Sequence, residues 1–337
     1  MFRRSRSLLV YLVLLLAVLY LLGRYGVFDV TTFTATEDRG TYALAFCPID
    51  DCEQAMLDAI GRTSDVRCAF YELSLPRMIA LLDEKQADVL VYDENARDLA
   101  EHDWITPVPS DGLMHDKFCV LDRTTVITGS TNPTGRGTKE SDNNLIIITS
   151  PVLAKNYLAE FDELKTDAAD ARVLTPRLQF TDIASNRTFL IENYFCPDDA
   201  CERHVLETLG RAKRSIRFMT FSFTSEAIGD LLVEKHATGM NVSGVFEKRQ
   251  ESKYSEYAGL RATGIPVLLD GNSADMHHKV FLIDPGTDDA IVILGSYNPT
   301  ANGNERNDEN LLIIHDATIA DAFVAEFDRI WADASTQ

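Results

Sequence analysis

The chain has 337 residues, of which 45% are hydrophobic, and a formal net charge of −20. This length and apolar content allow one large core or two ordinary ones, and they exclude collagen-like, low-complexity and wholly disordered proteins. Acidic residues outnumber basic ones by 52 to 32, which argues against a protein that coats nucleic acid through a generally basic surface. A local basic cleft stays compatible with this balance.

A membrane-targeting segment is expected at the N-terminus. Arg3, Arg4 and Arg6 precede an unbroken apolar run from Leu8 to Leu22, and Arg24 follows it. The run is shorter than the roughly 20 residues that cross a bilayer comfortably, so it fits an uncleaved transmembrane anchor or a secretory signal. No small-x-small cleavage site follows it, which favours the anchor. The excess of arginine before the run predicts a cytoplasmic N-terminus and an extracytoplasmic remainder, secreted if the segment is cleaved.

The cysteines fit an oxidising compartment. Four of them form two Cys-x4-Cys elements, Cys47 with Cys52 and Cys196 with Cys201. Two local disulfides are the simplest interpretation, and a zinc site is the alternative, although it lacks the usual x2 turn and a nearby pair of histidines. Cys68 and Cys119 lie in apolar, strand-like runs. Buried free thiols are the default expectation there, and a disulfide between them is the alternative.

The sequence predicts a tandem duplication, because similar residues follow each Cys-x4-Cys element. The first copy predicts helices at 53–60, 75–84 and 153–165 with strands at 66–73 and 88–92, and the second predicts helices at 225–236, 254–263 and 319–332 with a strand at 241–246. Strands that alternate with helices indicate an α/β fold of two pseudo-symmetric lobes. Each lobe is expected to hold a mixed, mostly parallel sheet flanked by helices.

The same comparison predicts the domain boundaries. The segments are an anchor or signal at 1–28, a spacer at 29–40, the first lobe at 41–166, a linker without strong periodicity at 167–186 and the second lobe at 187–337.

Each copy carries a His-x-Lys-x4-Asp motif that Gly-Ser-x-Asn follows. The residues are His115, Lys117, Asp122, Ser130 and Asn132 in the first copy and His277, Lys279, Asp284, Ser296 and Asn298 in the second. A histidine and a lysine two apart on a strand project from one face of the sheet. The lysine supplies charge for the developing negative oxygens of a phosphodiester, and the hydroxyl and amide can complete the oxygen contacts. His278, the middle residue of its motif, should point to the opposite face.

These residues resemble the HKD signature of the phospholipase D superfamily, and the resemblance runs from about residue 43 to residue 331. The second copy is particularly similar to small bacterial endonucleases and to members like mitochondrial cardiolipin hydrolase. The resemblance implies that both motifs form one active site, so that a single chain suffices for activity. It also implies that the reaction needs no metal and no cofactor. It also implies that one histidine, assigned here as His115, attacks phosphorus, while His277 protonates the leaving oxygen and then activates water. The opposite order stays open.

The family also carries an acidic residue after each motif, which holds the imidazole in one tautomer. Glu309 fits this role in the second copy, whereas Asn143 stands at the matching position of the first, with the neighbouring Asp142 as a possible substitute. Asn143 brings no charge, so the histidine that it serves loses stabilisation of its protonated form. Asp122 and Asp284 are expected to be structural residues that close the strand and its turn.

Four functions stay open at this point. A phospholipase D-like lipid hydrolase fits the expected anchor and the acidic composition, and a nuclease acting on DNA or RNA fits the resemblance of the second copy. A phosphatidyl transferase and an inactive phosphate-binding protein are the further alternatives. A basic groove would indicate a nuclease and an apolar mouth a lipase. The basic residues near the motifs are few, which favours lipid: Arg123, Arg136, Lys139 and Arg306.

Overall fold

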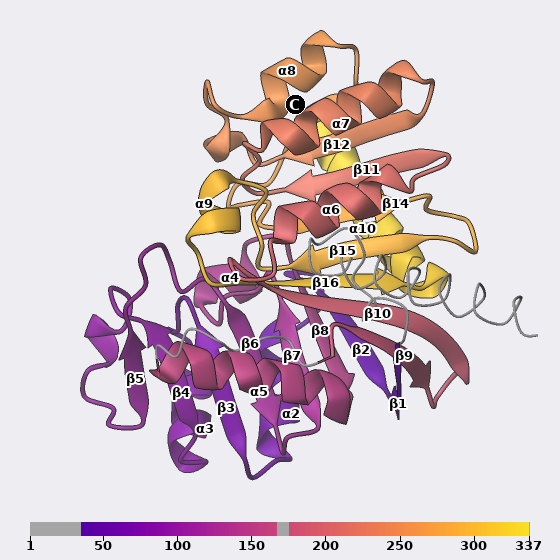
Figure 1. Cartoon of the computed structure of the whole chain (residues 1–337). Coiled ribbons are helices and arrows are strands. Elements are labelled where there is room, and N and C mark those ends of the chain that lie inside the picture. The colour runs from indigo at the N-terminus through magenta and orange to yellow at the C-terminus, as the bar shows by residue number, and fades with distance from the viewer. Residues whose placement is uncertain (1–34, 167–174, 337) are drawn as a thin grey trace, which may run out of the picture. The chain divides into compact units, whose positions relative to one another are not determined.

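Two β-sheets organise the computed structural model, which describes residues 35–166 and 175–336 (Figure 1). The seven-stranded sheet contains, in spatial order, β2 (Tyr42–Cys47), β8 (Asn143–Thr149), β7 (Thr125–Gly129), β6 (Lys117–Leu121), β3 (Val66–Phe70), β4 (Asp88–Tyr92) and β5 (Ile105–Val108). The nine-stranded sheet contains β1 (Thr36–Gly40), β9 (Arg177–Asp182), β10 (Arg187–Cys196), β16 (Glu309–His315), β15 (Ile291–Gly295), β14 (Lys279–Ile283), β11 (Ser215–Thr220), β12 (Asn241–Phe246) and β13 (Val267–Leu269). From β10 onward the second order repeats the first, which confirms two lobes of one duplicated fold.

Both sheets are mixed, as predicted, but the expectation that they are mostly parallel is wrong. Parallel pairing joins β3, β4 and β5 in one sheet and β11, β12 and β13 in the other. The strands from β2 to β3, and from β9 to β11, pair antiparallel. The alternation of strands and helices covers only the first part of each copy. Beyond it the chain returns through short connections, such as the one from β6 to β7, and these join antiparallel strands.

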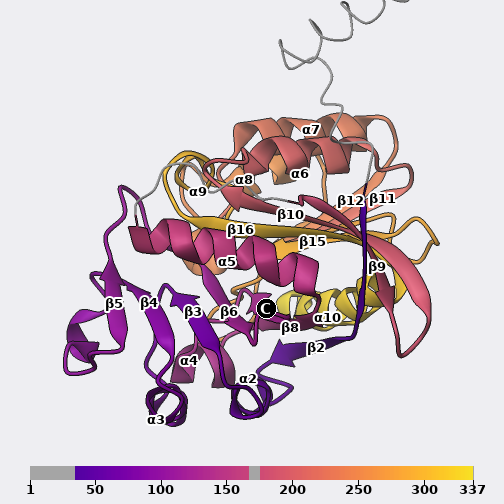
Figure 2. The same cartoon turned by 60° about the horizontal axis from the view of Figure 1, so that its bottom comes forward.

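Helices lie in three layers around the two sheets (Figure 2). The outer helices α2 (Cys52–Gly61) and α3 (Pro76–Glu84) cover the seven-stranded sheet, and α6 (Cys201–Gly210) and α7 (Glu226–Ala237) cover the nine-stranded sheet. The long helices α5 (Pro151–Thr166) and α10 (Ala317–Ser335) share one core with the inner faces of both sheets. The short helices are α4 (Gly135–Lys139), α8 (Glu256–Ala262), α9 (Ala301–Glu305), η2 (Arg97–Leu99) and η3 (Lys248–Gln250).

The apolar stripe of α10 explains why this helix lies in the central core. Ile319, Phe323, Phe327 and Ile330 recur at helical spacing and are all buried. Asp316 caps the first turn, since its side chain accepts a hydrogen bond from the backbone nitrogen of Ile319 at 2.8 Å. Burial of each large apolar side chain stabilises the fold by about 1.5–3 kcal/mol. The helix is thus fixed at the junction of the lobes, where its polar face can reach the motif segments.

Two segments that were expected to be spacer or linker form strands. β1 lies at the end of the expected spacer, and β9 lies inside the expected linker. In β9 the buried residues Leu178 and Phe180 alternate with more exposed ones, a six-residue pattern that is too short to stand out before the register with β10 is known. The expected anchor lies outside the described residues. Among the helices that the structure describes, none is long and apolar enough to span a bilayer.

Three disulfides link the six cysteines. Cys47 pairs with Cys52 and Cys196 with Cys201, as predicted, so the zinc alternative is wrong. The default expectation of free thiols at Cys68 and Cys119 is also wrong, because these two residues form the third disulfide. They lie directly opposite each other on the antiparallel strands β3 and β6. That register could not be read from either strand alone.

Candidate active site

The two motifs occupy matching positions at the starts of β6 and β14. Lys117 and Lys279 are the first residues of these strands, and each histidine lies two residues earlier in extended chain. Each lysine Nζ donates to the carbonyl oxygen of its own motif histidine, at 2.5 Å for Lys117 and 2.8 Å for Lys279. Both lysine charges act on both His115 and His277, so the four groups share one electrostatic environment. The structure therefore brings the two sequence motifs into one site.

Backbone hydrogen bonds attach each histidine to the opposite half of the chain. The backbone nitrogen of His115 donates to the carbonyl oxygen of Asp308 at 2.9 Å, and that of His277 donates to Asp142 at 2.8 Å. The two contacts are related by the duplication. The segment that precedes β16 is thereby held against the first motif, and the segment that precedes β8 against the second.

The orienting side chains consequently cross between the halves. Glu309, in the second half, lies 2.7 Å from His115 Nδ1, measured at Oε2. Asn143, in the first half, accepts a hydrogen bond from His277 Nδ1 at 2.9 Å. Asn143 stands in the first copy where the family has an acidic residue, so the first motif was expected to lack a carboxylate partner. This expectation is wrong, because it is His277 of the second motif that lacks one. His115 has one.

Both contacts select the same imidazole tautomer. An ionised carboxylate can only accept, so Nδ1 of His115 carries the hydrogen and Nε2 keeps its lone pair. The Nδ2 of Asn143 donates to the carbonyl oxygen of Gly137 at 2.9 Å, which turns its oxygen toward His277. His277 therefore also donates from Nδ1. The two Nε2 atoms are the ring nitrogens left for chemistry.

Asp142 does not replace the missing carboxylate. Its Oδ1 accepts from Arg329 at 2.5 Å and its Oδ2 accepts from Asn272 at 2.7 Å. Only its carbonyl oxygen contacts His277. The expectation that Asp142 substitutes for a charged partner of the imidazole ring is therefore wrong.

Burial reduces the positive charge that the resting site can hold. It lowers the pKa of both His115 and His277, and the neighbouring lysine charges lower both pKa values further. Burial also lowers the pKa of Lys117 to about 8 and that of Lys279 well below its usual value. Burial raises the pKa of Glu309 to about 7. A bound phosphodiester would reverse the trend, since an adjacent negative charge favours the protonated lysines and imidazoles.

The Gly-Ser-x-Asn segments start with a glycine that no other residue could replace. Gly129 and Gly295 have φ values of 139° and 142°. A Cβ at these positions would lie 2.3 Å from the carbonyl oxygen of Asn144 and 2.2 Å from that of Asn310, respectively. Glycine thus permits the close approach of each segment to the strand that carries the orienting residue.

The serines of these segments support the orienting residues and are fully buried. Ser130 Oγ donates to Asn143 Oδ1 at 2.9 Å and accepts from the backbone nitrogen of Asn144 at 3.0 Å. Ser296 Oγ accepts from the backbone nitrogen of Asn310 at 2.9 Å. Of the two roles expected for the serines, phosphate contact and support, these contacts correspond to support.

The asparagines of the segments are the groups left for a ligand. Asn132 and Asn298 each have a buried side-chain oxygen that lacks a hydrogen-bond partner among the described residues. The two occupy matching positions, and each directly follows the residue next to the buried serine. A phosphate oxygen accepts hydrogen bonds, so these carboxamides would bind it through Nδ2, while their unpartnered oxygens can accept from another donor.

The aspartates of the motifs lie at the far ends of β6 and β14. Asp122 Oδ1 accepts from the backbone nitrogens of Ser64 and Asp65, both at 2.9 Å. Asp284 accepts from the backbone nitrogens of Lys213, Arg214 and Ser215. Each carboxylate joins the turn after the motif strand to the loop before β3 or β11, which is the structural role expected of both.

His278 points away from the site, as predicted. It is fully buried, with Nδ1 3.0 Å from Asn144 Nδ2 and Nε2 3.1 Å from Glu326 Oε1 on α10. Asp116 occupies the matching place in the first motif and accepts from Asn310 Nδ2 at 2.8 Å. Both middle residues of the motifs thus bind an asparagine of the opposite half and help to hold the halves together.

Two aromatic residues of the site were missed by the sequence analysis. The rings of Tyr71 and His115 lie 4.9 Å apart, and those of Phe221 and His277 lie 4.6 Å apart. Lys117 Nζ is 5.2 Å from the Tyr71 ring and Lys279 Nζ is 4.7 Å from the Phe221 ring. Both aromatic residues directly follow the strand that neighbours the motif strand, β3 or β11. Tyr71 and Phe221 occupy matching places in the two copies, and this correspondence could have identified them from the sequence.

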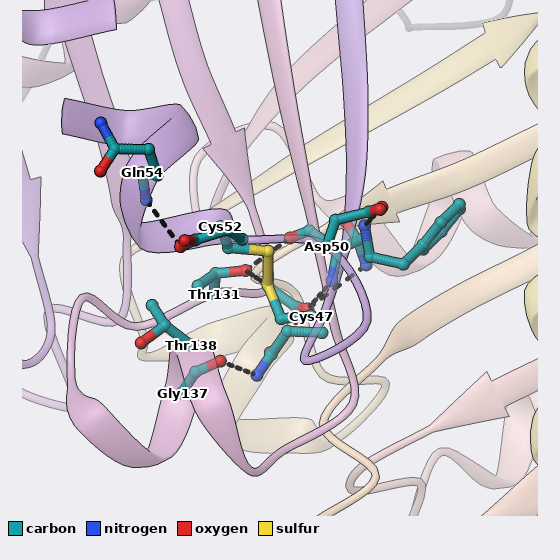
Figure 3. Close-up of a disulfide and its surroundings, with 12 residues drawn as sticks. Cys47, Asp50, Cys52, Gln54, Thr131, Gly137 and Thr138 are labelled. Atoms are coloured by element: carbon teal, nitrogen blue, oxygen red, sulfur yellow. Dashed lines mark hydrogen bonds between the residues drawn. A yellow bond between two sulfur atoms is a disulfide. The ribbon is translucent and has the colours of Figure 1, made fainter. Parts of the chain in front are cut away.

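Each Cys-x4-Cys disulfide adjoins one orienting residue. Cys47 is paired with Asn143 across β2 and β8, and Cys196 is paired with Glu309 across β10 and β16. Figure 3 shows Cys47 Sγ close to Thr131, 3.4 Å from its Oγ1. The disulfides thus fasten the strand ends against which the orienting residues lie.

The basic residues singled out in the sequence are engaged by protein partners. Their contacts are Arg123 with Asp65, Arg136 with Asp275, Lys139 with Glu53, and Arg306 with the carbonyl oxygen of Asp111. Three of these partners are carboxylates, which reduce the net positive charge that the residues present.

A family model described as "Cardiolipin synthase, PLD-like domain" matches residues 54–165 and 205–331, and so includes both motifs. The chain belongs to the phospholipase D superfamily. Mitochondrial cardiolipin hydrolase of Xenopus tropicalis is 32% identical over 142 residues, which cover 41% of this chain and 66% of that protein. Phospholipase D of Rickettsia bellii (strain RML369-C) is 27% identical over 150 residues, which cover 44% of this chain and 73% of that protein.

The fold of this phospholipase D superfamily member extends over both lobes. The crystal structure of phosphatidylserine synthase from Haemophilus influenzae Rd KW20 matches 86% of this chain and 85% of its own, with a TM-score of 0.61 and 12% identity. At this identity the match shows the fold alone. The prediction of an enzyme of the phosphodiesterase type is confirmed at the level of the family.

Proposed function

We propose that this protein hydrolyses the head-group phosphodiester bond of phospholipids through a covalent phosphohistidine. One observation carries the proposal: two histidines from different halves each have Nδ1 bound by the opposite half, within one site that holds two lysines. This arrangement supplies a nucleophile, an acid and base, and cationic groups for the phosphoryl oxygens.

The asymmetry of the orienting residues supports His115 as the nucleophile. When Nε2 attacks phosphorus, the ring gains positive charge, and a carboxylate on Nδ1 stabilises that charge. Glu309 lies 2.7 Å from His115 Nδ1, whereas both partners of His277 Nδ1 are neutral: the amide oxygen of Asn143 at 2.9 Å and the carbonyl oxygen of Ser130 at 3.1 Å. The carboxylate is thus placed at the ring that would become a cationic phosphohistidine.

The neutral partner suits His277 as the general acid and base. A protonated imidazole without a carboxylate releases its proton more readily, which helps the departure of an alkoxide. In the first step the P–N bond to His115 forms, the bond from phosphorus to the leaving oxygen breaks, and the proton moves from His277 Nε2 to that oxygen. In the second step His277 takes a proton from water, the water oxygen bonds to phosphorus and the P–N bond breaks. Both histidines return to their starting protonation states.

The distribution of charge favours a phospholipid over a nucleic acid. The chain has a formal net charge of −20, and Arg136 and Lys139 near the motifs are paired with Asp275 and Glu53. A polyanion would meet few unpaired cations there and a repulsive long-range field. The expected N-terminal anchor would hold the catalytic lobes at the outer face of the membrane, which adds a reason to propose a lipid substrate.

A direct comparison of substrates tests the proposal. The full chain in detergent micelles would be assayed on phosphatidylcholine, on cardiolipin and on single-stranded DNA, with His115→Ala as the blank. We expect head-group release from lipid to exceed DNA cleavage. A preference for DNA by orders of magnitude would replace the lipid hydrolase with an extracytoplasmic nuclease of the same mechanism. Transfer of the phosphatidyl group to an added alcohol in place of water would indicate a transferase.

A further inference from the structure

The two central helices differ at one charged position. α5 and α10 are equivalent in the duplication, and Glu160 on α5 matches Glu326 on α10. One turn later, however, α5 carries Glu163 where α10 carries Arg329. A carboxylate in one lobe is thus replaced by a guanidinium group in the other, close to the segments that orient the two histidines.

Arg329 contacts the residue that precedes Asn143. Its Nη2 donates to Asp142 Oδ1 at 2.5 Å, and its Nε donates to Glu326 Oε2 at 2.9 Å. The carbonyl oxygen of the same Asp142 accepts from the backbone nitrogen of His277. The guanidinium group therefore joins α10 to the peptide that carries the orienting amide.

The same network contacts the residue that follows Asn143. Glu326 Oε1 lies 3.1 Å from His278 Nε2, and His278 Nδ1 lies 3.0 Å from Asn144 Nδ2. Burial raises the pKa of Glu326, but the hydrogen bonds from Arg329 and His278 outweigh it and hold that pKa at about 2. The carboxylate is thus ionised at any working pH. Both neighbours of Asn143 are held from α10 by charged or hydrogen-bonded groups.

The other half contains no such clamp among the described residues. Glu163 stands at the matching position, and it acts on Asp308, the residue before Glu309, only as a like charge. Burial, together with the neighbouring carboxylates, raises the pKa of Asp308 to about 7. His115 does not depend on a clamp to the same degree, because Glu309 itself supplies a charge-assisted contact to its ring.

We propose that Arg329 is a positioning residue, which holds Asn143 and His277 in the geometry that the acid and base step requires. The amide contact to His277 is neutral and therefore weaker than the carboxylate contact to His115. The clamp from α10 compensates by fixing the backbone on both sides of the amide. The inference rests on the proposed function in one respect, namely that His277 is the acid and base.

Pre-steady-state kinetics with substrate in excess separate the two steps. The probe is bis(4-nitrophenyl) phosphate, whose leaving group departs as a stable anion and needs little help from an acid. In Arg329→Met we expect a burst of nitrophenolate within about threefold of the wild-type rate, because His115 is untouched. Steady-state turnover should fall by about 10–100-fold, since small misplacements of a catalytic group have effects of this size. KM should fall in proportion to kcat, so that kcat/KM stays within about threefold of wild type, because only breakdown of the phosphohistidine is slowed. Arg329→Lys should recover part of the loss in kcat.

The matched control is Arg217→Met. Arg217 Nη1 binds Asp328 on the same helix at 3.0 Å, and its side chain is 29% exposed against 30% for Arg329. This ion pair joins β11 to α10 and involves neither orienting residue, so its loss should leave both steps unchanged. If burst and turnover fall together in Arg329→Met, or if neither falls, the positioning role is refuted.

A second readout does not depend on turnover. Nitrogen-15 NMR of the imidazole rings in the full chain would report the tautomer of each histidine. We expect the His277 signals of Arg329→Met, or of Arg329→Lys if the first variant unfolds, to move from one tautomer toward a mixture while those of His115 stay. Unchanged His277 signals would overturn the inference. A wild-type protein that neither turns over phospholipid or the probe nor yields a trapped phosphohistidine would instead refute the proposed function, and the NMR result would still decide the role of Arg329.

Discussion

Glu309 Oε2 lies 2.7 Å from Nδ1 of His115, although the two residues belong to different halves of the duplication. The reciprocal contact, from Asn143 to His277, has the same geometry but no charge. The active site is therefore symmetric in its backbone and asymmetric in its electrostatics. Because each half supplies the orienting residue of the other, neither lobe could form a competent site by itself.

Replacement of Glu309 by Gln should reduce kcat far more than the small change in the side chain suggests. Asn307 Nδ2 donates to Glu309 Oε1 at 3.1 Å, which would keep the Gln oxygen on that side and turn its NH2 toward His115 Nδ1. The amide would then donate to Nδ1 and move the ring hydrogen to Nε2, which removes the attacking lone pair. We expect kcat to fall by about 10²–10⁴-fold with an unchanged fold, as wrong-tautomer substitutions do. Steady-state kinetics with circular dichroism as the folding control measures this.

The converse substitution, Asn143→Asp, provides the paired comparison. It should raise the pKa of His277 and move the acid limb of the pH profile to higher pH, because the base must lose its proton before water is activated. Nearly wild-type turnover in the Glu309→Gln variant would show that the carboxylate contact is dispensable.

Trapping experiments should distinguish the two histidines. With bis(4-nitrophenyl) phosphate, His277→Ala should still release a burst of nitrophenolate, because this leaving group needs no proton, and should then stall at the phosphohistidine. His115→Ala should give no burst. Mass spectrometry of peptides quenched at alkaline pH would locate the phosphoryl group on His115. Phosphate found on His277 would reverse the assignment and leave the double displacement intact.

The repeat and its two motifs could be predicted from the sequence because each is a local pattern. Strand 241–246 and the helices around 53–60, 75–84 and 225–236 were located to within one or two residues for the same reason. The crossed pairing of Glu309 and Asn143 could not be predicted, since it depends on how one half docks against the other.

Two other features that the sequence did not predict have the same physical cause as the crossed pairing. The disulfide between Cys68 and Cys119 depends on the register of β3 and β6, and the strand β9 depends on the partner that β10 provides. In both cases the deciding interaction joins segments that are separate in sequence, where local propensity carries no information.

The decline in activity at high pH should reflect the loss of a proton from the buried lysines. Burial lowers the pKa of Lys117 to about 8, so the free enzyme loses this charge as the pH rises through 8. Since kcat/KM reports groups of the free enzyme, it should decline above about pH 8. The decline in kcat should occur at higher pH, because bound phosphate favours the protonated lysine. Initial rates from about pH 6 to 10 test this, with circular dichroism at each pH to exclude unfolding. A kcat/KM that stays constant to the top of this range would contradict the assignment.

Stability should depend on pH through Asp116, which lies between His115 and Lys117. Burial raises its pKa to about 8, its Oδ1 accepts from Asn310, and its Oδ2 has no partner among the described residues. An unfolded Asp titrates near about pH 3.9, so between about pH 4 and pH 8 the folded state binds the proton that the unfolded state has released. The contribution of Asp116 to stability therefore falls as the pH rises through this window and levels off above it.

Asp116→Asn removes this dependence, because the amide keeps the shape and never ionises. The variant should unfold at a temperature close to that of wild type at about pH 5 and several degrees higher at about pH 8.5, where a gain of about 1 kcal/mol already shifts Tm by roughly 2–4 °C. Asp122→Asn is the control without pH dependence in this range. Backbone hydrogen bonds from Asp65 and Ser64 lower the pKa of Asp122, so its carboxylate is ionised in both buffers and its loss should lower Tm by a similar amount in each. Thermal unfolding at both pH values measures the two variants, and an equal Tm change for Asp116→Asn in the acidic and the alkaline buffer would refute the buried, protonated carboxyl.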